Sequence, residues 1–334
     1  MTTLITLSLI TILTLLLIPI YLVTQPTLRF QIRKEKPTLI QAKNLKEHVY
    51  TIVERFYDRS HQNMEMLDDT AQYIYEHFSK YCDDVRLEPF KVKSFSLKGE
   101  YLEYQNVVAT FEGSEGKEGE YIVVGGHYDT FAGHAGANDN TSAVAGLMEL
   151  SRVLSLYPPK SNIMLVSYCL EEPPFFGTQK MGSFKHAQNL KLENKNVKLA
   201  IVMDMIGFYS LEKGSQTYPI PLMKLFYPDS ANYISVVSNL SWKNIFYTRK
   251  TKNIFKQSSN LPVYSINAPI RMTGIDFSDH RNYWKFDYPA IMITDTAFYR
   301  TDKYHTPNDT PDTLNYENMA KVMDGIFMMI REMK

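Results

Sequence analysis

The chain begins with a long apolar segment that carries no charge. Residues 4–23 read LITLSLITILTLLLIPIYLV, and about 20 apolar residues are what a helix needs to cross the hydrocarbon core of a bilayer. The segment has neither the basic start nor the small-residue cleavage pattern of a signal peptide. We therefore expect residues 1–25 to form an uncleaved, single-pass transmembrane helix that anchors the protein in a membrane.

Basic residues follow this predicted anchor. They are Arg29, Arg33, Lys34 and Lys36. The positive-inside rule would place this flank, and with it the rest of the chain, in the cytoplasm.

Two amphipathic helices are predicted after a polar linker over residues 26–44. Apolar residues recur at helical spacing in two stretches before residue 82. They are Leu45, Val49, Ile52, Val53 and Phe56 in the first stretch and Leu67, Ala71, Ile74, Phe78 and Tyr81 in the second. Packing against a core explains both apolar faces.

Short β-rich runs then alternate with helical stretches. The expected strands are residues 85–92, 105–113, 121–130, 162–170, 199–207 and 288–296. The expected helices are residues 142–156, 183–192 and 316–333. This alternation predicts an α/β fold in which a parallel-type sheet lies between helices. Residues 208–275 have weaker periodicity, and we expect a strand and helices mixed with a long insertion there.

Composition excludes several classes of protein. The 334 residues are 44% hydrophobic and 22% charged, which excludes a disordered, collagen-like or disulfide-scaffold chain. The 36 Lys and Arg residues balance 36 Asp and Glu residues, so we expect no nucleic-acid partner. Cys82 and Cys169 are too few for a disulfide framework or a cysteine zinc site. Any metal must therefore bind to His, Asp and Glu.

Polar side chains stand where the central strands end. His127 and Asp129 follow YIVVGG, and Glu171 and Glu172 follow MLVSYCL. Asp204 lies in the run LAIVMDMIG. In an open α/β sheet, ligands bind at the carboxyl ends of the strands, so these side chains are expected to converge in space.

Asp139 in GANDN and His305 in YHTPNDTPDT complete this candidate cluster. Crowded carboxylates repel one another and raise one another's pKa, whereas one or two divalent ions neutralise this repulsion. A ligand set of imidazole and carboxylate without cysteine fits Zn²⁺ first and Mn²⁺ or Co²⁺ second. Any one of these residues alone would more often be a helix cap or a hydrogen-bonded turn residue. Their conjunction favours a metal site.

Six motifs together resemble a known family. In chain order they are GGHYDT, GANDNTSAVA, CLEE, the Asp of VMDMIG, SDHRNYW and YHTPNDTPDTLNYENMAKV. Over about residues 60–334 the chain resembles the zinc-dependent aminopeptidases of metallopeptidase family 28, the group that includes bacterial leucyl aminopeptidase. The resemblance implies one domain over residues 45–334. Its fold would be a three-layer sandwich with a mixed, mostly parallel sheet between helices.

The resemblance also implies a ligand set for two Zn²⁺ ions per chain. His127 and Asp204 would hold one zinc ion. Glu172 and His305 would hold the other, and Asp139 would bridge both.

Catalytic and supporting roles follow from the same resemblance. Glu171 would be the general base that takes a proton from metal-bound water. The Asp129 carboxylate would orient the His127 ring. Asp279 and His280 of the SDH pattern would belong to the pocket wall or support the ligands.

One departure from the family pattern is visible beside the glutamates. Leu170 precedes them where the family commonly has a small residue, and Pro173 and Pro174 follow. The prolines stiffen the loop and leave both carboxylates intact.

The leading hypothesis is a di-zinc exopeptidase that hydrolyses the N-terminal peptide bond of peptides with a free N-terminus. Within the same fold, the alternatives are a single-zinc glutaminyl-peptide cyclotransferase and a carboxypeptidase that acts on acidic C-termini. A non-enzymatic alternative is a binding module resembling the transferrin-receptor ectodomain, which loss of metal ligands would mark. Because related exopeptidases are frequently exported, the side of the membrane stays open between cytoplasmic and exported.

Overall fold

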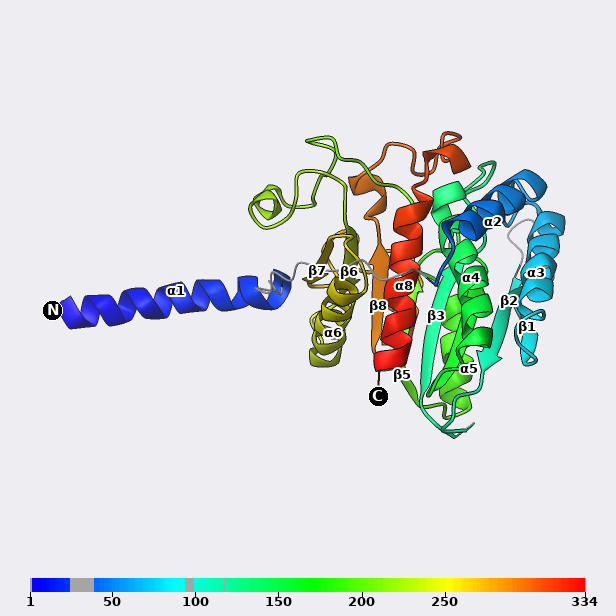
Figure 1. Ribbon diagram of the computed structural model, residues 1–334, viewed down its shortest axis with the longest axis horizontal. Helices are drawn as coiled ribbons and strands as arrows, with labels where there is room; N and C mark the ends of the chain where they lie inside the picture. Colours follow the sequence, from blue (N-terminus) through cyan, green and yellow to red (C-terminus); the bar gives the residue numbers. More distant parts are fainter. Residues whose placement is uncertain (1, 25–38, 94–98, 117, 334) are drawn as a thin grey trace.

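One sheet of eight strands organises the part of the chain that the structure describes, which is residues 2–24, 39–93, 99–116 and 118–333 of a computed structural model. The strands are β1 (Val85–Lys93), β2 (Tyr101–Phe111), β3 (Tyr121–His127), β4 (Asn162–Tyr168), β5 (Val197–Met203), β6 (Ile234–Ser238), β7 (Val263–Asn267) and β8 (Ala290–Thr294). Their order across the sheet is β1-β2-β4-β3-β5-β8-β6-β7 (Figure 1). The central strands β4, β3, β5 and β8 run parallel, as do β6 and β7, whereas β1, β2 and the β8/β6 pair are antiparallel.

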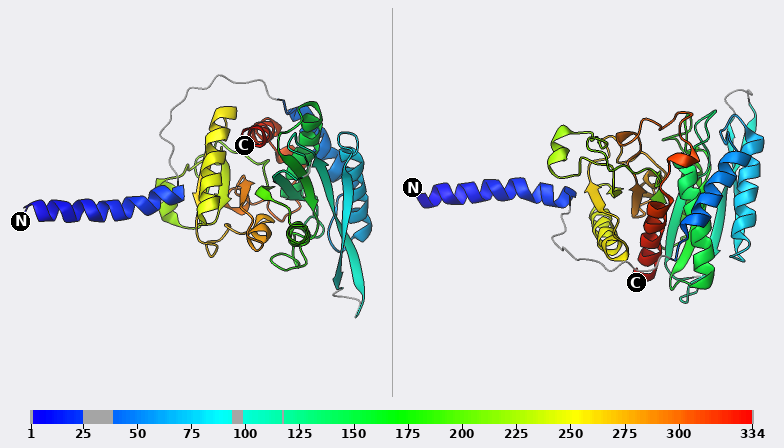
Figure 2. Two further views of the ribbon diagram at one scale, coloured as in Figure 1. Left: turned by 90° about the horizontal axis from the view of Figure 1, so that it is seen from below. Right: turned by 45° about the horizontal axis from the view of Figure 1, so that its top comes forward.

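Helices cover both faces of this sheet. They are α2 (Ala42–Arg55), α3 (Met64–Phe78), α4 (Ser142–Leu156), α5 (Gly182–Leu192), α6 (Trp242–Ser258), α7 (His280–Trp284) and α8 (Tyr316–Glu332). The helices α2, α3, α4, α6 and α8 form one layer, and α5 and α7 pack on the other face (Figure 2). The predicted three-layer sandwich with a mixed sheet is confirmed.

Alternation along the strands divides the core in two. In β3, Ile122 and Val124 belong to the core beneath α4 and α8, whereas Val123 belongs to the core on the α5 and α7 side. All three are fully buried. Successive side chains of a strand point to opposite faces, so a continuous apolar run is what a strand covered on both faces requires.

The ends of the predicted strands differ from the observed ones by up to four residues, and two regions differ further from what the sequence predicts. The helix α2 begins at Ala42, inside the predicted linker, because the Gln41 N–H is held by Glu149 of α4 at 2.9 Å. The stretch 208–275 resolves into β6, α6 and β7 after a long insertion. Each of these two strands has only five residues, too short for a clear period. Residues 26–38 of the predicted linker lie outside the described residues.

The N-terminal segment requires a correction. It forms a helix, α1 (Thr2–Thr24), whose end lies beside α6 and β7 (Figure 1), where Lys252 donates to the Thr24 carbonyl at 3.1 Å. Over the described residues, however, no helix combines the length and the apolar character that crossing a membrane requires. The predicted transmembrane span over 4–23, and membrane association through it, are therefore not supported. The cellular location stays a prediction.

Candidate metal centre

The carboxyl ends of three parallel strands build one side of the site. His127 is the last residue of β3, Glu171 and Glu172 follow β4, and Asp204 follows β5 directly. Because β3 lies between β4 and β5, these residues meet at one edge of the sheet, as predicted.

Asp139 and His305 reach the same place from loops. Asp139 lies in the turn Ala137–Thr141 that enters α4, and His305 lies between β8 and α8. Gly136 opens that turn with φ 56°, and a Cβ there would collide with the Asp139 carbonyl and with Thr130. A left-handed residue without a side chain is therefore required at this position.

Distances define a cluster with two halves joined by Asp139. Asp139 Oδ1 lies 3.3 Å from His127 Nε2, and Asp139 Oδ2 lies 3.2 Å from His305 Nε2. In the first half, Asp204 Oδ1 lies 3.9 Å from His127 Nε2. In the second half, Glu172 Oε2 lies 3.1 Å from His305 Nε2. The structure thus brings all five sequence-predicted ligands together, with Asp139 between the two histidines.

Glu171 lies in the same cluster. Its Oε2 is 3.8 Å from His127 Nε2, and it forms a further potential metal-binding group with His127 and Glu172. The geometry therefore places Glu171 close enough to act on a group held by the cluster.

Asp129 is placed somewhat differently from the expectation. The His127 Nδ1 hydrogen bond goes to the Asp129 backbone carbonyl at 3.0 Å, while the carboxylate lies 3.5 Å away. The two carboxylate oxygens accept the backbone N–H groups of Glu171 and Glu172, each at 3.1 Å. Asp129 thus connects the end of β3 to the glutamate pair. The sequence predicted only that it orients the His127 ring.

The crowding of carboxylates shifts their acidity. Burial, with repulsion from Asp139, raises the pKa of Glu172 to about 7. Burial, with Asp139 and Asp279 nearby, raises the pKa of Asp204 to about 8. Burial and the Asp204 charge also raise the pKa of Glu171 well above its usual range. Such shifts are expected where like charges meet in a low-dielectric site without a cation.

The two imidazoles respond in the opposite direction. Burial alone would lower the pKa of His305, but Asp139 and Glu172 outweigh it and raise that pKa to about 10. The pKa of Asp139 is held below its usual range, because the His127 and His305 imidazoles at 3.3 and 3.2 Å outweigh its burial. Without another cation, the histidines are the positive partners of this cluster.

Two atoms show that the residues fit a metal ion. Among the described residues, His305 Nε2 and Glu172 Oε1 are buried and have no hydrogen-bond partner, although His305 Nε2 faces two carboxylates at close range. Buried polar atoms without partners are costly. Imidazole nitrogen and carboxylate oxygen are zinc ligands, and each half of the cluster supplies one imidazole and two carboxylates, with Asp139 common to both.

A family model now decides the identity of this site. The model described as "Peptidase family M28" matches residues 106–330, which is more than half of the chain and includes the whole cluster. The chain belongs to peptidase family M28. It is therefore an enzyme, a zinc metallopeptidase.

Individual relatives agree with this assignment to family M28. The uncharacterized protein YfbL from Escherichia coli is 40% identical over 306 residues, which cover 89% of this chain and 90% of YfbL. The zinc aminopeptidase BSAP from Bacillus subtilis has a similar structure, with a TM-score of 0.67, 14% identity, and coverage of 89% of this chain and 97% of that one. A glutaminyl cyclase from Bacteroides thetaiotaomicron is also similar, with a TM-score of 0.65, 18% identity, and coverage of 89% and 99%. At these identities the two structures establish the fold only.

Sequence reasoning missed three residues that hold this M28 site in place. Asp309 accepts the backbone N–H groups of Asn138 and Asp139 at 2.8 and 3.0 Å. Asn140 bonds the backbone on both sides of Asp204, at Met203 and Met205. Asp309 could have been found from its place in the same motif as His305, and Asn140 from its place in GANDN.

The third missed residue is Arg59, which is 1% exposed beneath the site. Its guanidinium donates to the carbonyls of Tyr128 and Ala135, at 2.9 and 3.1 Å, and to Thr141 Oγ1 at 2.7 Å. Arg59 thus joins the end of β3 to the Asp139 turn. It precedes every motif and has no sequence signal.

Asp279 and His280 do not belong to the metal-binding groups of the described residues. Both are fully buried, and His280 Nε2 is bonded to the Ile275 carbonyl at 2.8 Å. Burial raises the pKa of Asp279 to about 7. Their predicted place beside the site, rather than among its ligands, agrees with this position.

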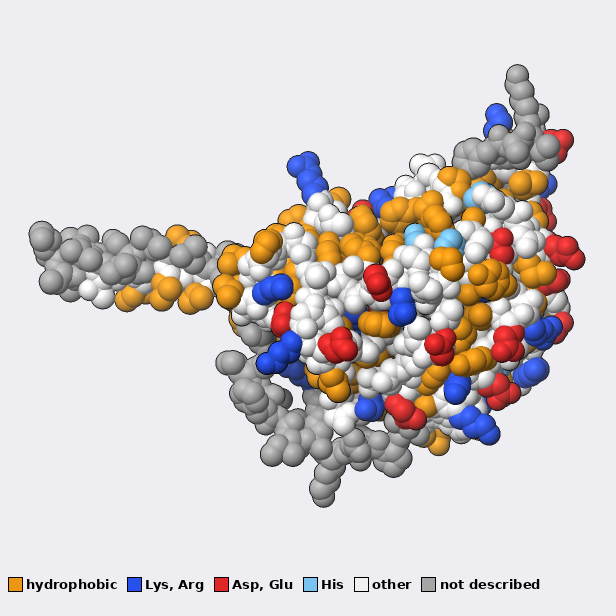
Figure 3. Space-filling model, turned by 90° about the horizontal axis from the view of Figure 1, so that it is seen from above, with side chains coloured by type: hydrophobic (Ala, Val, Ile, Leu, Met, Phe, Trp, Pro, Cys, Tyr) orange, Lys and Arg blue, Asp and Glu red, His pale blue; other side chains and the backbone are white. Residues whose placement is uncertain are grey.

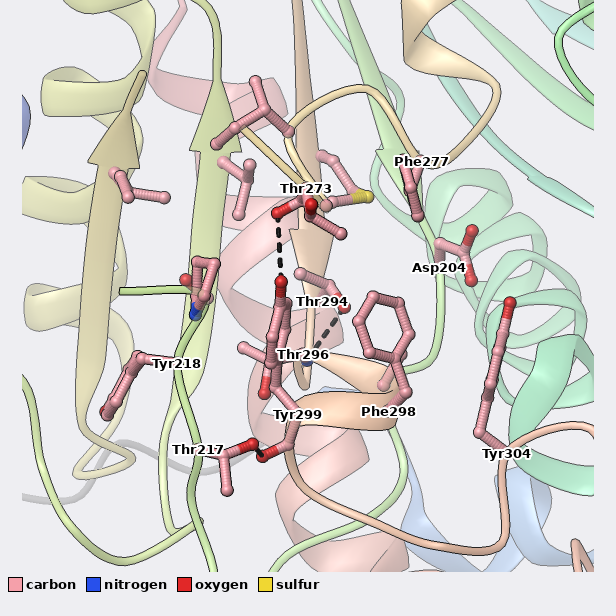
Figure 4. Close-up of a pocket in the computed structure, with 18 of the residues that line it drawn as sticks. Asp204, Thr217, Tyr218, Thr273, Phe277, Thr294, Thr296, Phe298, Tyr299 and Tyr304 are labelled. Atoms are coloured by element: carbon pink, nitrogen blue, oxygen red, sulfur yellow. Dashed lines mark hydrogen bonds between the residues drawn. The ribbon is translucent and has the colours of Figure 1, made fainter. Parts of the chain in front are cut away.

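A cavity of about 200 Å³ opens beside the metal centre of this M28 enzyme. Asp204 and Tyr304 stand at one side of it and Tyr218 at the other (Figure 4). On the face seen from above, histidine side chains reach the surface among hydrophobic ones (Figure 3). The cavity is lined partly by the Tyr-rich stretch 208–275. The sequence suggests this stretch as a pocket wall but does not identify the lining residues.

Proposed function

We propose that this chain is a two-zinc exopeptidase that hydrolyses the N-terminal peptide bond of peptides. One observation carries the proposal: the two carboxylate oxygens of Asp139 face two different histidines, each with a further carboxylate beside it. A bridging carboxylate between two imidazole-carboxylate halves is the ligand arrangement that a two-metal site needs.

His127 and Asp204 would hold one zinc ion, Glu172 and His305 the other, and Asp139 both. Zinc in these positions supplies Lewis-acid chemistry, polarising a peptide carbonyl and making a water molecule more acidic. The side chains of the chain then have to bind the peptide and move protons.

Glu171 is the residue to which we assign proton transfer. Its backbone N–H is fixed by Asp129, so its side chain is presented to the cluster from a rigid base. Burial raises its pKa well above the ordinary value, which favours a carboxylate that can accept a proton from water and return it to the leaving amine.

A glutaminyl cyclase is the second candidate, because a protein of that name has a similar structure. Cyclisation of an N-terminal glutamine releases ammonia and consumes no water. Such an enzyme would require only one half of the cluster to hold zinc. The symmetric position of Asp139 favours the hydrolase over the cyclase and over a binding module that has lost its ligands.

Zinc stoichiometry and product analysis test the proposal together. We expect two zinc ions per chain, hydrolysis of a leucyl peptide, and no hydrolysis of its N-acetyl form. Asp139→Ala should lower occupancy of both sites, whereas Glu172→Ala should weaken mainly one. Full activity with one zinc ion and formation of pyroglutamate from a glutaminyl peptide would identify the cyclase. Release of C-terminal residues would identify a carboxypeptidase.

A further inference from the structure

The cavity beside the metal centre runs along one face of three strands. Asp204 stands at its metal end, and its floor is formed by Met292 of β8, Val237 of β6 and Ile266 of β7. These are successive strands of the sheet after β5. With about 4.8 Å between neighbouring strands, the floor extends roughly 14 Å from β5 to β7.

The end of α1, a short 3-10 helix (Pro221–Leu225) and loops cover this part of the sheet, and Val23 of α1 packs against the same apolar cluster. On the same face, α5 packs on β1 and β2, and α7 packs on β5 and β8. Above β6 and β7, the described residues include Met223 and Tyr227 of the insertion and Met272 of the loop after β7. A cavity remains between these segments and the strands.

The polar groups around this cavity are largely occupied by the protein itself. The Tyr218 and Tyr227 hydroxyls donate to the carbonyls of Pro228 and Ser265, at 2.5 and 2.8 Å. Gln216 bonds Thr296 and Arg300. Beyond the metal cluster, no charged side chain lines the described part of the cavity. A polar or charged substituent would therefore lose its hydration and gain little in return.

The cavity is larger than an ordinary side chain needs. Its 200 Å³ offers room for roughly seven water molecules at about 30 Å³ each, whereas a leucine side chain has four carbons. From C–C bonds of about 1.5 Å at a nearly tetrahedral angle, an extended alkyl chain advances about 1.25 Å per carbon, so roughly 14 Å corresponds to about 11 carbons.

We propose that this enzyme acts on amides whose acyl part carries a long alkyl chain, which lies in the channel over β8, β6 and β7. The inference rests on the proposed function, since it places the scissile carbonyl at the metal centre. Two sources share this chemistry: an N-terminal residue with a long aliphatic or lipid-modified side chain, and a fatty acyl amide without an amine.

A chain-length series on the zinc-loaded full chain tests the proposal. The substrates are the p-nitroanilides of alanine, leucine, 2-aminooctanoic acid and 2-aminododecanoic acid. Each buried CH₂ can contribute up to about fourfold, so we expect kcat/KM for the 2-aminododecanoyl substrate at least about tenfold above that for leucine. Dodecanoyl p-nitroanilide distinguishes the sources, because only a fatty acyl amidase would hydrolyse it comparably. The proposal would be overturned if kcat/KM were highest for the leucine substrate and lower for the substrates with longer chains.

Substitution at the far end of the channel locates the effect. Ile266→Trp should remove the advantage of the long chain, measured as the ratio of kcat/KM between the 2-aminododecanoyl and leucyl substrates. Leu222→Trp is the matched control, because Leu222 is 62% exposed and lies outside the cavity lining. Leu222→Trp should leave kcat/KM unchanged for both the leucyl and the 2-aminododecanoyl substrate.

Ligand binding keeps this inference separate from the proposed function. If the zinc-loaded enzyme hydrolyses no anilide of any length, the exopeptidase proposal fails. Calorimetry with dodecylamine and butylamine then still tests the channel. We expect dodecylamine to bind at least about tenfold more tightly to wild type, and equal binding would refute the channel.

Discussion

Glu171 is the carboxylate of the cluster whose role a single substitution can isolate. Glu171→Gln keeps the shape of the side chain and removes its ability to accept a proton. General acid-base catalysis contributes typically about 10² to 10⁴-fold, so kcat should fall by about that factor. The zinc content and KM for an unblocked peptide should stay nearly unchanged, as measured by metal analysis and steady-state kinetics.

The zinc measurement also separates catalysis from ligation, because Glu171 lies within a potential metal-binding group with His127 and Glu172. Loss of one zinc ion in Glu171→Gln would show that the residue is a ligand. A turnover within about threefold of wild type would contradict its role as the base.

Asp309 holds Asp139, the proposed bridging ligand, through the backbone. Its two oxygens accept the N–H groups of Asn138 and Asp139, so Asp309→Asn places an amide NH₂ against one of these donors. Loss of a group that supports metal ligands typically lowers metal affinity by about 10 to 100-fold. We expect zinc affinity to fall at both sites, measured by competition with a chelator.

Asp312 offers a matched control for this substitution. It lies three residues further along the same loop and is exposed. Asp312→Asn should bind zinc like the wild type, and an equal loss of affinity in both variants would refute the positioning role of Asp309.

At the scale of elements, a pair of histidines sets how the α2, α3 and α4 packing responds to pH. His48 of α2 meets His77 of α3 with 4.7 Å between ring centres, and His77 Nε2 is bonded to the Met148 carbonyl of α4 at 3.1 Å. Burial, together with the His77 charge, lowers the pKa of His48 to about 4. The unfolded chain, with a histidine pKa near 6.5, therefore binds this proton more readily than the folded one.

The zinc-loaded protein should accordingly lose stability as the pH falls from about 6.5 toward 4. The contribution of His48 to this loss is on the order of 1 to 3 kcal/mol. Urea unfolding at pH 7 and pH 5, compared between the wild type and His48→Gln, measures it. The free energy of unfolding should differ less between pH 7 and pH 5 in the variant than in the wild type. An identical difference in both proteins would refute this assignment.

At the scale of the whole molecule, zinc is expected to control stability because the cluster joins the ends of three strands to two loops. Without zinc, burial and neighbouring carboxylates hold the pKa of Glu172 at about 7 and that of Asp204 at about 8. Both values lie above those of the unfolded chain, so the folded state keeps these protons longer. The metal-free protein should therefore lose stability as the pH rises from about 5 to 8.

Zinc should remove much of this dependence by neutralising the carboxylates, and it adds stability by binding only the folded chain, about 4 kcal/mol at 1,000 times its Kd. Thermal unfolding of chelator-treated and reloaded protein at pH 5 and pH 8 measures both effects. A metal-free protein that is as stable at pH 8 as at pH 5 would contradict the predicted electrostatics.

The sequence by itself determined the layer architecture and which candidate ligands meet at one edge of the sheet. Continuous apolar runs lie within 121–130, 162–170 and 199–207, and strands buried on both faces have that pattern. His127, Glu172 and Asp204 stand at or just beyond the ends of those strands, so the rule for parallel sheets was enough to bring them together. The motifs were similarly enough to predict Asp139 and His305 as partners.

Tertiary structure decided what depends on contacts between distant segments. Arg59, Asp309 and Asn140 act on backbone groups that the chain order does not bring near them. The motifs could point to Asp309 and Asn140 but not to the groups that they bond, and nothing in the sequence pointed to Arg59. The start of α2 depends on Glu149, more than 100 residues away. The channel over β8, β6 and β7 lies between these strands and segments from distant parts of the chain. Its volume therefore depends on how those segments pack, which no local pattern shows.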